Sequence, residues 1–131
     1  MNIPEKLFYS KEHEWVRVEG DHAFVGITDY AQHSLGDIVF VELPDLDSEV
    51  AAMGEAGVVE SVKAVSPIYS PVAGTIVAVN NKLENSPELL NQTPYDEFIF
   101  EVQLGSAFDP SSLLDAAAYK AFCDDLDKGK H

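Results

Sequence analysis

The sequence predicts a mainly β domain with a few short helices and one longer helix towards its C-terminal end. Segments 14–19 and 98–104 alternate apolar and polar residues, which is the pattern of a half-buried strand. Between residues 49 and 81, valine and alanine are interrupted by five glycines and prolines, too many for a helix. Beyond residue 109, apolar residues recur close to the helical period.

A hairpin is expected near the N-terminus. In segment 14–19, two valines fall on one face while tryptophan and charged residues fall on the other. The pair Gly20-Asp21 favours a turn, and the apolar residues 23–27 predict the returning strand. The two strands should therefore pair in an antiparallel manner.

A short helix and a third strand are expected next. Thr28 carries a side-chain oxygen that can cap a helix N-terminus, and Gly36 stands where a left-handed residue would end that helix. Residues 37–43 are almost continuously apolar and are followed by Pro44, which predicts a strand that stops there.

The C-terminal half should add a helical turn, a last strand and a helix. Ser86 can cap a helix whose first residue is Pro87, so a short helix is expected through Leu90. Residues 98–104 form the last strand, and the region 109–128 has an apolar stripe with a period of about 3.6 residues that should pack on the sheet. The strand face is expected to consist of Phe98, Phe100, Val102 and Leu104, and the helix stripe of Leu113, Leu114, Ala117, Ala118, Ala121, Phe122 and Leu126.

An internal repeat organises the middle of the chain. Residues 57–64 can be laid over residues 74–81 without a gap, which places Lys63-Ala64 opposite Asn80-Asn81. Because an Asn-Asn pair is typical of turns, Lys63 is expected at the tip of a hairpin. Valine-rich strands align easily, so ordinary strand composition is the alternative explanation of the match itself.

Composition limits the class of protein. A chain of 131 residues, 46% of them hydrophobic, is long enough for one packed domain. Eight basic residues against 23 acidic ones give a formal net charge of −15. This charge repels phosphate backbones and anionic lipids, so neither nucleic acid nor a membrane is an expected partner.

Cysteine and histidine usage predicts neither a disulfide nor a metal site. Cys123 is the only cysteine, and the histidines at positions 13, 22, 33 and 131 lack metal-ligand spacing. Residues 1–10 resemble neither a signal peptide nor a transit peptide, and no apolar run reaches the roughly 20 residues of a membrane helix. We therefore expect a cytoplasmic protein, or a mitochondrial matrix protein only if a transit peptide has been removed.

Lys63 is the only base in the 64 residues between Arg17 and Lys82, a stretch that contains ten acids. At a hairpin tip its amine would lie in water, where Glu60 and the acidic surroundings favour the charged form over the neutral amine that a nucleophile needs. A lysine presented in this way suits modification by another enzyme. The alternative is an ordinary solubilising surface lysine.

Five blocks carry a family resemblance. They are His13-Glu14-Trp15-Val16, Gly26 to Gln32, Leu35 to Pro44, Gly57 to Ser66 and Ser86 to Leu89. In this order they resemble the glycine cleavage H-protein family over essentially the whole chain, and the block around Lys63 resembles its lipoyl-attachment signature. The sequence departs from the family after Pro94-Tyr95, where a Gly-Trp pair is usual, and Phe98 is expected to replace that tryptophan in packing.

The resemblance implies a flattened β sandwich of the lipoyl/biotinyl, or barrel-sandwich hybrid, type. Residues 1–131 would form a single lipoyl-carrier domain, with a lipoyl-binding core at about 22–104 and a C-terminal helical region at about 109–128.

Three residues take their expected roles from the same resemblance. It implies that lipoic acid is amide-linked to Lys63 and that Glu60 helps a lipoate-attaching enzyme to recognise the site. Gly74 would stand where such domains turn.

The resemblance also implies a carrier, not an enzyme, and no catalytic residue is predicted. The lipoyl arm would take an aminomethyl group from a pyridoxal-phosphate glycine decarboxylase, deliver it to an aminomethyltransferase and be reoxidised by dihydrolipoamide dehydrogenase. The loaded arm would fold into a cleft near His13 and Glu14, where Glu14 could pair with the ammonium group; the alternative for Glu14 is a solvated strand acid. The carrier is expected to be a monomer.

Other carriers share a hairpin lysine. Biotin carriers flank it with methionines, unlike Val62 and Ala64, and lipoyl domains of 2-oxo acid dehydrogenases favour aspartate before it and belong to longer chains. A lipoyl-relay protein, which hands lipoate to other lipoyl domains, is not separated from a glycine cleavage carrier by the sequence.

The aromatic residues outside the motifs have a structural expectation. Trp15, Tyr30, Phe40 and Tyr69 are expected to pack in or beside the core and not to face partners. Cys123 is expected to pack as a small apolar residue.

Overall fold

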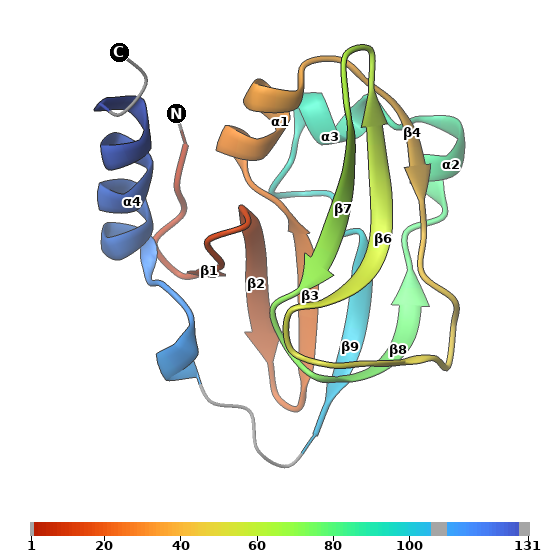
Figure 1. Ribbon diagram of the computed structural model, residues 1–131. Helices are drawn as coiled ribbons and strands as arrows, with labels where there is room; N and C mark the ends of the chain where they lie inside the picture. Colours follow the sequence, from red (N-terminus) through yellow and green to blue (C-terminus); the bar gives the residue numbers. More distant parts are fainter. Residues whose placement is uncertain (1, 106–109, 129–131) are drawn as a thin grey trace.

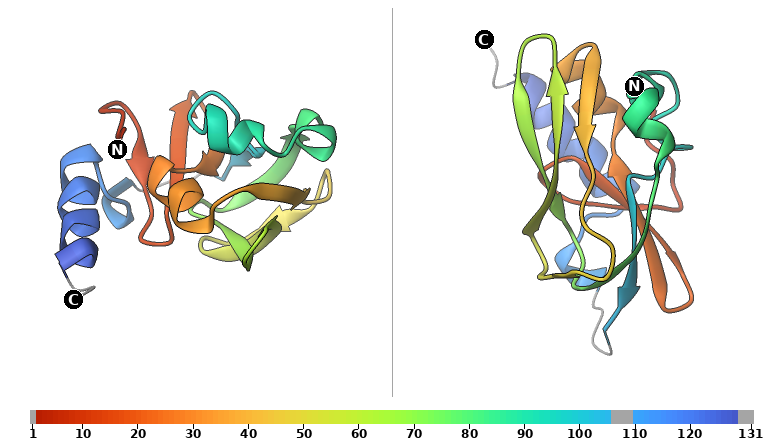
Figure 2. Two further views of the ribbon diagram at one scale, coloured as in Figure 1. Left: turned by 90° about the horizontal axis from the view of Figure 1, so that it is seen from above. Right: turned by 90° about the vertical axis from the view of Figure 1, so that its right-hand side faces the viewer.

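Two β-sheets packed face to face form the body of the computed structural model, which describes residues 2–105 and 110–128 (Figure 1). Three short helices gather at one end of the two sheets, and a longer helix, α4 (Ala116–Lys128), lies beside them (Figures 1 and 2). This arrangement confirms the mainly β fold expected from the sequence. No helix in the described ranges is long and apolar enough to cross a membrane.

The chain alternates strands with short helices. The strands are β1 (Phe8–Tyr9), β2 (Glu14–Glu19), β3 (His22–Ile27), β4 (Ile38–Glu42), β5 (Glu49–Val50), β6 (Gly54–Ser61), β7 (Val65–Ser70), β8 (Gly74–Val79) and β9 (Phe100–Leu104). The helices are α1 (Asp29–Leu35), α2 (Lys82–Asn85), α3 (Leu89–Gln92), the 3-10 turn η1 (Pro110–Ser112) and α4.

Both sheets are antiparallel. The six-stranded sheet has the order β1-β2-β3-β9-β8-β5, and the three-stranded sheet has the order β4-β6-β7. The hairpin expected at the N-terminus is formed by β2 and β3, in which Val16 lies opposite Val25. The two repeated segments fall in different sheets, β6 in the smaller and β8 in the larger.

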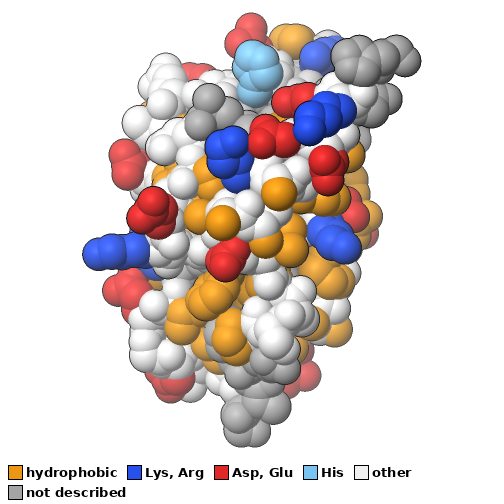
Figure 3. Space-filling model, turned by 90° about the vertical axis from the view of Figure 1, so that its left-hand side faces the viewer, with side chains coloured by type: hydrophobic (Ala, Val, Ile, Leu, Met, Phe, Trp, Pro, Cys, Tyr) orange, Lys and Arg blue, Asp and Glu red, His pale blue; other side chains and the backbone are white. Residues whose placement is uncertain are grey.

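The core lies between the sheets, and a second apolar cluster lies under α4. Val59 and Ile68 of the smaller sheet face the same core as Ile76 and Val102 of the larger one. The second cluster contains four fully buried side chains, Tyr9, Trp15, Tyr119 and Cys123. The α4 side of the molecule carries both acidic and basic side chains (Figure 3), including the exposed pair Lys120–Asp124, whose Nζ and Oδ2 are 3.0 Å apart.

Helix α1 has the caps that the sequence predicts. The Thr28 hydroxyl accepts a hydrogen bond from the Ala31 N–H at 3.2 Å, and Gly36 follows the helix with a φ of 80°. That φ lies in the left-handed region, which glycine tolerates without a Cβ clash.

Two boundaries near the C-terminus were wrongly predicted. The predicted helix through Leu90 begins instead at Leu89, because residues 86–88 form a turn after α2. Strand β9 begins at Phe100, and Phe98 packs in the second cluster, with its ring edge-on to Phe24 at 5.3 Å.

The predicted apolar stripe of the C-terminal helix was wrong in part: Leu113, Leu114 and Phe122 do pack against the core clusters, but the three alanines do not. Within the described part of region 109–128, η1 is followed by an interruption, and α4 starts only at Ala116; residue 109 lies outside the described residues. Ala117, Ala118 and Ala121 are exposed, whereas Tyr119 and Cys123 are fully buried. The helix therefore packs through its tyrosine and cysteine, against the N-terminal edge of the larger sheet and not across its face.

Candidate cofactor attachment site

Lys63 lies at the tip of the hairpin formed by β6 and β7, as the sequence predicts. The tip is closed by a backbone hydrogen bond from Ser61 N–H to the Ala64 carbonyl at 2.8 Å. The Ser61 hydroxyl accepts hydrogen bonds from the N–H groups of Lys63 and Ala64, at 3.3 and 3.1 Å. A serine hydroxyl that accepts hydrogen bonds from the backbone two and three residues later stabilises a turn locally. The conformation of this tip therefore depends mainly on residues within a few positions of Lys63.

The tip rests on the segment between α1 and β4. Val62 N–H donates to the Asp37 carbonyl at 3.0 Å, and a Cβ placed on Gly36 would lie 3.5 Å from Cε of Lys63. Asn91 of α3 fixes this segment from behind: its Nδ2 donates to the Gly36 carbonyl at 2.9 Å, and its Oδ1 accepts from Ile38 N–H at 2.9 Å. The sequence did not single out Asn91, because its partners lie more than 50 positions away.

Apolar side chains surround the tip in an exposed position. Val62 and Val65 are each 68% exposed, and Val39 and Phe40 of β4 are 54% and 48% exposed. The expectation that Phe40 packs in or beside the core was therefore wrong, because its side chain is among the exposed large hydrophobic ones. A bulge between Ile38 and Phe40 breaks the alternation of β4 and leaves two consecutive residues facing solvent.

Glu60 and Gly74 occupy different ends of the molecule. Glu60 is half-buried on β6, between Phe40 and Val65 on the neighbouring strands and close to the tip. Gly74 begins β8 at the end of the two sheets opposite the tip (Figure 1). A Cβ there would lie 2.1 Å from the Gln103 carbonyl oxygen, so close approach of the backbones requires glycine.

Glu14 is buried at the start of β2, beside β7, which excludes the solvated strand acid considered from the sequence. Glu14 is only 2% exposed. We call residues 10–14 the Glu14 corner. The Ser10 hydroxyl donates to Oε1 of Glu14 at 2.5 Å, and Tyr69 N–H donates to Oε2 at 3.3 Å. Burial raises the pKa of Glu14 to about 8, and the Glu12 carboxylate adds to the increase, whereas these two hydrogen bonds oppose it.

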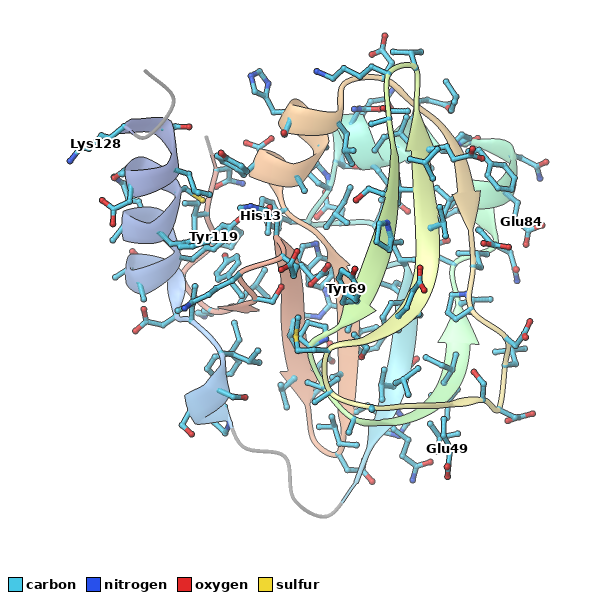
Figure 4. The ribbon with its side chains drawn as sticks, viewed as in Figure 1. His13, Glu49, Tyr69, Glu84, Tyr119 and Lys128 are labelled. Atoms are coloured by element: carbon cyan, nitrogen blue, oxygen red, sulfur yellow. The ribbon has the colours of Figure 1, made fainter. Side chains whose placement is uncertain are left out.

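His13 turns the chain into β2 and contacts α4. Its φ of 69° is in the left-handed region, and its Nδ1 lies 2.7 Å from the Tyr119 hydroxyl. The ring stacks on Tyr30 with 4.5 Å between centroids. Figure 4 shows Tyr119 reaching from α4 towards His13, with Tyr69 on β7 to the other side.

The structure thus brings together residues that the sequence considered separately. Strand β7 starts beside the Lys63 tip and reaches the Glu14 corner at Tyr69, four residues later, or about 13 Å along an extended strand. Ser10 and Tyr69 hydrogen-bond the Glu14 carboxyl, and Tyr119 contacts His13. No local motif in the sequence marks these three residues. Among residues 2–105 and 110–128, no group of His, Cys, Asp and Glu side chains could hold a metal ion.

Comparisons with known proteins agree on one family. The family model described as glycine cleavage H-protein matches residues 7–126. Two bacterial proteins named glycine cleavage system H protein are similar to the chain: that of Syntrophomonas wolfei is 58% identical, covering 94% of this chain and 95% of its own length, and that of Symbiobacterium thermophilum is 56% identical, covering 92% and 95%. The crystal structure of a glycine cleavage system H protein from Mycobacterium marinum superposes with a TM-score of 0.85 at 35% identity, covering 93% of this chain and 99% of that one.

Proposed function

The chain belongs to the glycine cleavage H-protein family, and from this premise we propose that Lys63 bears its covalently attached lipoyl group. The chain is a lipoyl carrier in glycine cleavage. The observation that carries the proposal is the Lys63 tip itself, an exposed lysine on a rigid hairpin whose backbone is bonded on both sides. A lipoate-attaching enzyme can bind such a tip without unfolding it.

The residues around the tip fit a lipoyl amide. Acylation removes the charge of Lys63. The attached apolar chain would then start beside two exposed apolar side chains, Val62 and Val65. Glu60, three residues before the lysine, would contribute to recognition by the attaching enzyme. When bound, the lipoyl dithiolane supplies the thiol and redox chemistry of aminomethyl transfer, while the protein supplies the tether and a high effective concentration at its partners.

We propose four partners that use this arm. They are a pyridoxal-phosphate glycine decarboxylase, an aminomethyltransferase, dihydrolipoamide dehydrogenase and the lipoate-attaching enzyme. The chain itself would act as a monomeric, non-catalytic carrier. Because its only cysteine, Cys123, is buried as a free thiol, we propose a reducing, cytoplasmic location.

We further propose that the Glu14 corner shelters the aminomethyl-bearing arm. With a pKa of about 8, Glu14 is mostly protonated at neutral pH, so its carboxyl must lose a proton to pair with a cation. One pKa unit corresponds to about 1.4 kcal/mol, which a close ammonium group can supply in a site removed from water. Replacement of Glu14 by glutamine should therefore speed hydrolysis of the loaded arm; an unchanged hydrolysis rate would exclude this role.

Reconstitution tests the carrier function. Lipoylated protein is mixed with the decarboxylase, aminomethyltransferase, dihydrolipoamide dehydrogenase, glycine, tetrahydrofolate and NAD, and NADH formation is followed. We expect NADH formation to depend on this chain and to be lost with Lys63→Arg, whose charge and length are similar. Undiminished NADH formation with Lys63→Arg would contradict the proposal.

A further inference from the structure

We propose that helix α4 positions the Glu14 carboxyl and that Tyr119 is the positioning residue through which it does so. This proposal rests on the proposed function only in so far as the Glu14 corner is taken to shelter the aminomethyl-bearing arm. The placement of the carboxyl is a separate claim, and it can be tested on the protein without a lipoyl group.

The Tyr119 hydroxyl connects α4 with both segments that enclose the start of β2. It lies 2.7 Å from Nδ1 of His13 and 2.7 Å from Oγ1 of Thr28. Thr28 N–H also donates to the His13 carbonyl at 3.0 Å. Because burial raises the pKa of Tyr119 far above its usual range, the hydroxyl keeps its proton and can donate one hydrogen bond while accepting another.

The Tyr119 ring also fixes the other end of the Glu14 corner. It stacks on Tyr9 with 4.6 Å between centroids and an interplanar angle of 6°. Tyr9 in turn exchanges two backbone hydrogen bonds with Leu114, at 2.7 and 2.8 Å. Tyr9 immediately precedes Ser10, whose hydroxyl donates to Glu14. Tyr119 therefore supports Ser10 through Tyr9 and also contacts His13 directly.

The corner between these two anchors is a closed turn. His13 N–H donates to the Ser10 carbonyl at 3.2 Å, and Ser10 N–H donates to the Glu14 carbonyl at 2.9 Å. Glu14 N–H donates to the Ser10 hydroxyl at 3.1 Å. Displacement of either anchor would therefore move Ser10 and Glu14 together.

The backbone of His13 indicates that the corner needs external support. A left-handed φ is unfavourable for a residue other than glycine and persists only where surrounding contacts determine it. Those contacts include Tyr30 stacked on one side and Tyr119 and Phe122 from α4, the last with centroids 5.9 Å from the His13 ring. Helix α4 thus provides much of the environment that selects this conformation.

The test is the titration of Glu14 in the full-length, unlipoylated chain, followed by NMR of its side-chain carboxyl carbon. The groups that act on this carboxyl are the Ser10 hydroxyl, Tyr69 N–H and the Glu12 carboxylate, and burial dominates. Tyr119→Phe removes the hydroxyl and keeps the ring that stacks on Tyr9. We expect the titration midpoint of Glu14 to fall by about one pH unit, because loosening of the corner admits water to the carboxyl.

Tyr95→Phe is the matched control. It removes another tyrosine hydroxyl of the same cluster, which donates to the Asn2 carbonyl at 2.6 Å and accepts from Asp29 N–H at 3.1 Å, both partners outside residues 10–14. The Glu14 midpoint should not move in this control. An unchanged midpoint in Tyr119→Phe, or an equal shift in both variants, would overturn the proposal.

A second readout separates this inference from the proposed function. In lipoylated, aminomethyl-loaded protein, Tyr119→Phe should shorten the lifetime of the loaded arm while leaving lipoylation of Lys63 unchanged. If the Glu14 midpoint shifts and the lifetime does not, α4 positions the carboxyl but the corner does not shelter the arm. If the midpoint stays fixed while Glu14→Gln alone shortens the lifetime, the sheltering role holds and positioning by Tyr119 is wrong.

Discussion

The Lys63 hairpin and the Glu14 corner lie at two points along the same strand, β7, but are built in opposite ways. The hairpin tip is exposed and held by Ser61, which lies two positions from the lysine. In the corner, Ser10 and Glu14 are buried. Glu14 is held by Tyr69, which is 55 positions away, and His13 by Tyr119, which is 106 positions away. One is a local device and the other depends on the whole fold.

The difference follows from the environment that each ionisable group requires, the Lys63 amine in one region and the Glu14 carboxyl in the other. Under the proposed function, Lys63 must stand in water on an ordered turn, and hydrogen bonds within a few residues are sufficient for this. A carboxyl whose pKa is raised to about 8 must instead be removed from water, which only tertiary packing can achieve. The tip should therefore tolerate substitutions that the corner does not.

The largest contrast is expected in stability. Tyr119→Ala removes a fully buried ring and should lower the free energy of unfolding by about 3–5 kcal/mol. Val62→Ala, at an exposed position of the tip, should change it by less than about 0.5 kcal/mol. Urea denaturation followed by circular dichroism measures both, and comparable losses would contradict the distinction between the two regions.

The next effect is on the pH dependence of stability. The pKa of Glu14 is about 8 in the folded protein and has an ordinary value of 4.5, so between these values the folded state keeps a proton that the unfolded chain has lost. The free energy of unfolding should therefore fall as the pH rises from 4.5 to 8.

Glu14→Gln should remove this contribution, so the variant gains stability relative to the unsubstituted chain and gains most near pH 8. Thermal unfolding across this pH range measures the slope. Glu55→Gln, at an exposed position of β6, is the control for the loss of one acid. Equal slopes for Glu14→Gln and the unsubstituted chain would show that the carboxyl is not held in its protonated form.

The smallest effect is expected at the tip. Ser61→Ala removes the acceptor of two backbone N–H groups, at a cost of about 1 kcal/mol or less because water can replace it. The looser tip should reduce kcat/KM for lipoylation several-fold. Val65→Thr, which keeps the branched shape at an exposed position, should leave stability unchanged. Lipoylation of Ser61→Ala at the unsubstituted rate would mean that the hydroxyl does not order the tip.

The same contrast explains which features could be predicted from the sequence. The Lys63 tip, the Thr28 cap and the Gly36 C-cap all depend on neighbouring residues, and each was predicted correctly. The exposure of Phe40 was not predicted, because a bulge in β4 arises from pairing with β6 and leaves no mark in the alternation of residues.

The start of the C-terminal helix and the contacts of the Glu14 corner could not be predicted from the sequence, for related reasons. Leu113 and Leu114 continue the helical period, yet Leu114 pairs with Tyr9, and the helix begins only at Ala116. The buried contact of Tyr119 with His13 depends on that docking. Family resemblance indicated His13 and Glu14, but their partners Ser10, Tyr69 and Tyr119 became visible only in three dimensions.

The most direct test of the central claim, that the lipoyl group resides on Lys63, is intact mass spectrometry of the protein made in lipoylation-competent cells. One lipoyl-sized addition is expected in the unsubstituted chain, located on the peptide that contains Lys63, and none in Lys63→Arg. An addition that persists in Lys63→Arg, or the absence of any addition to the unsubstituted chain, would contradict the claim.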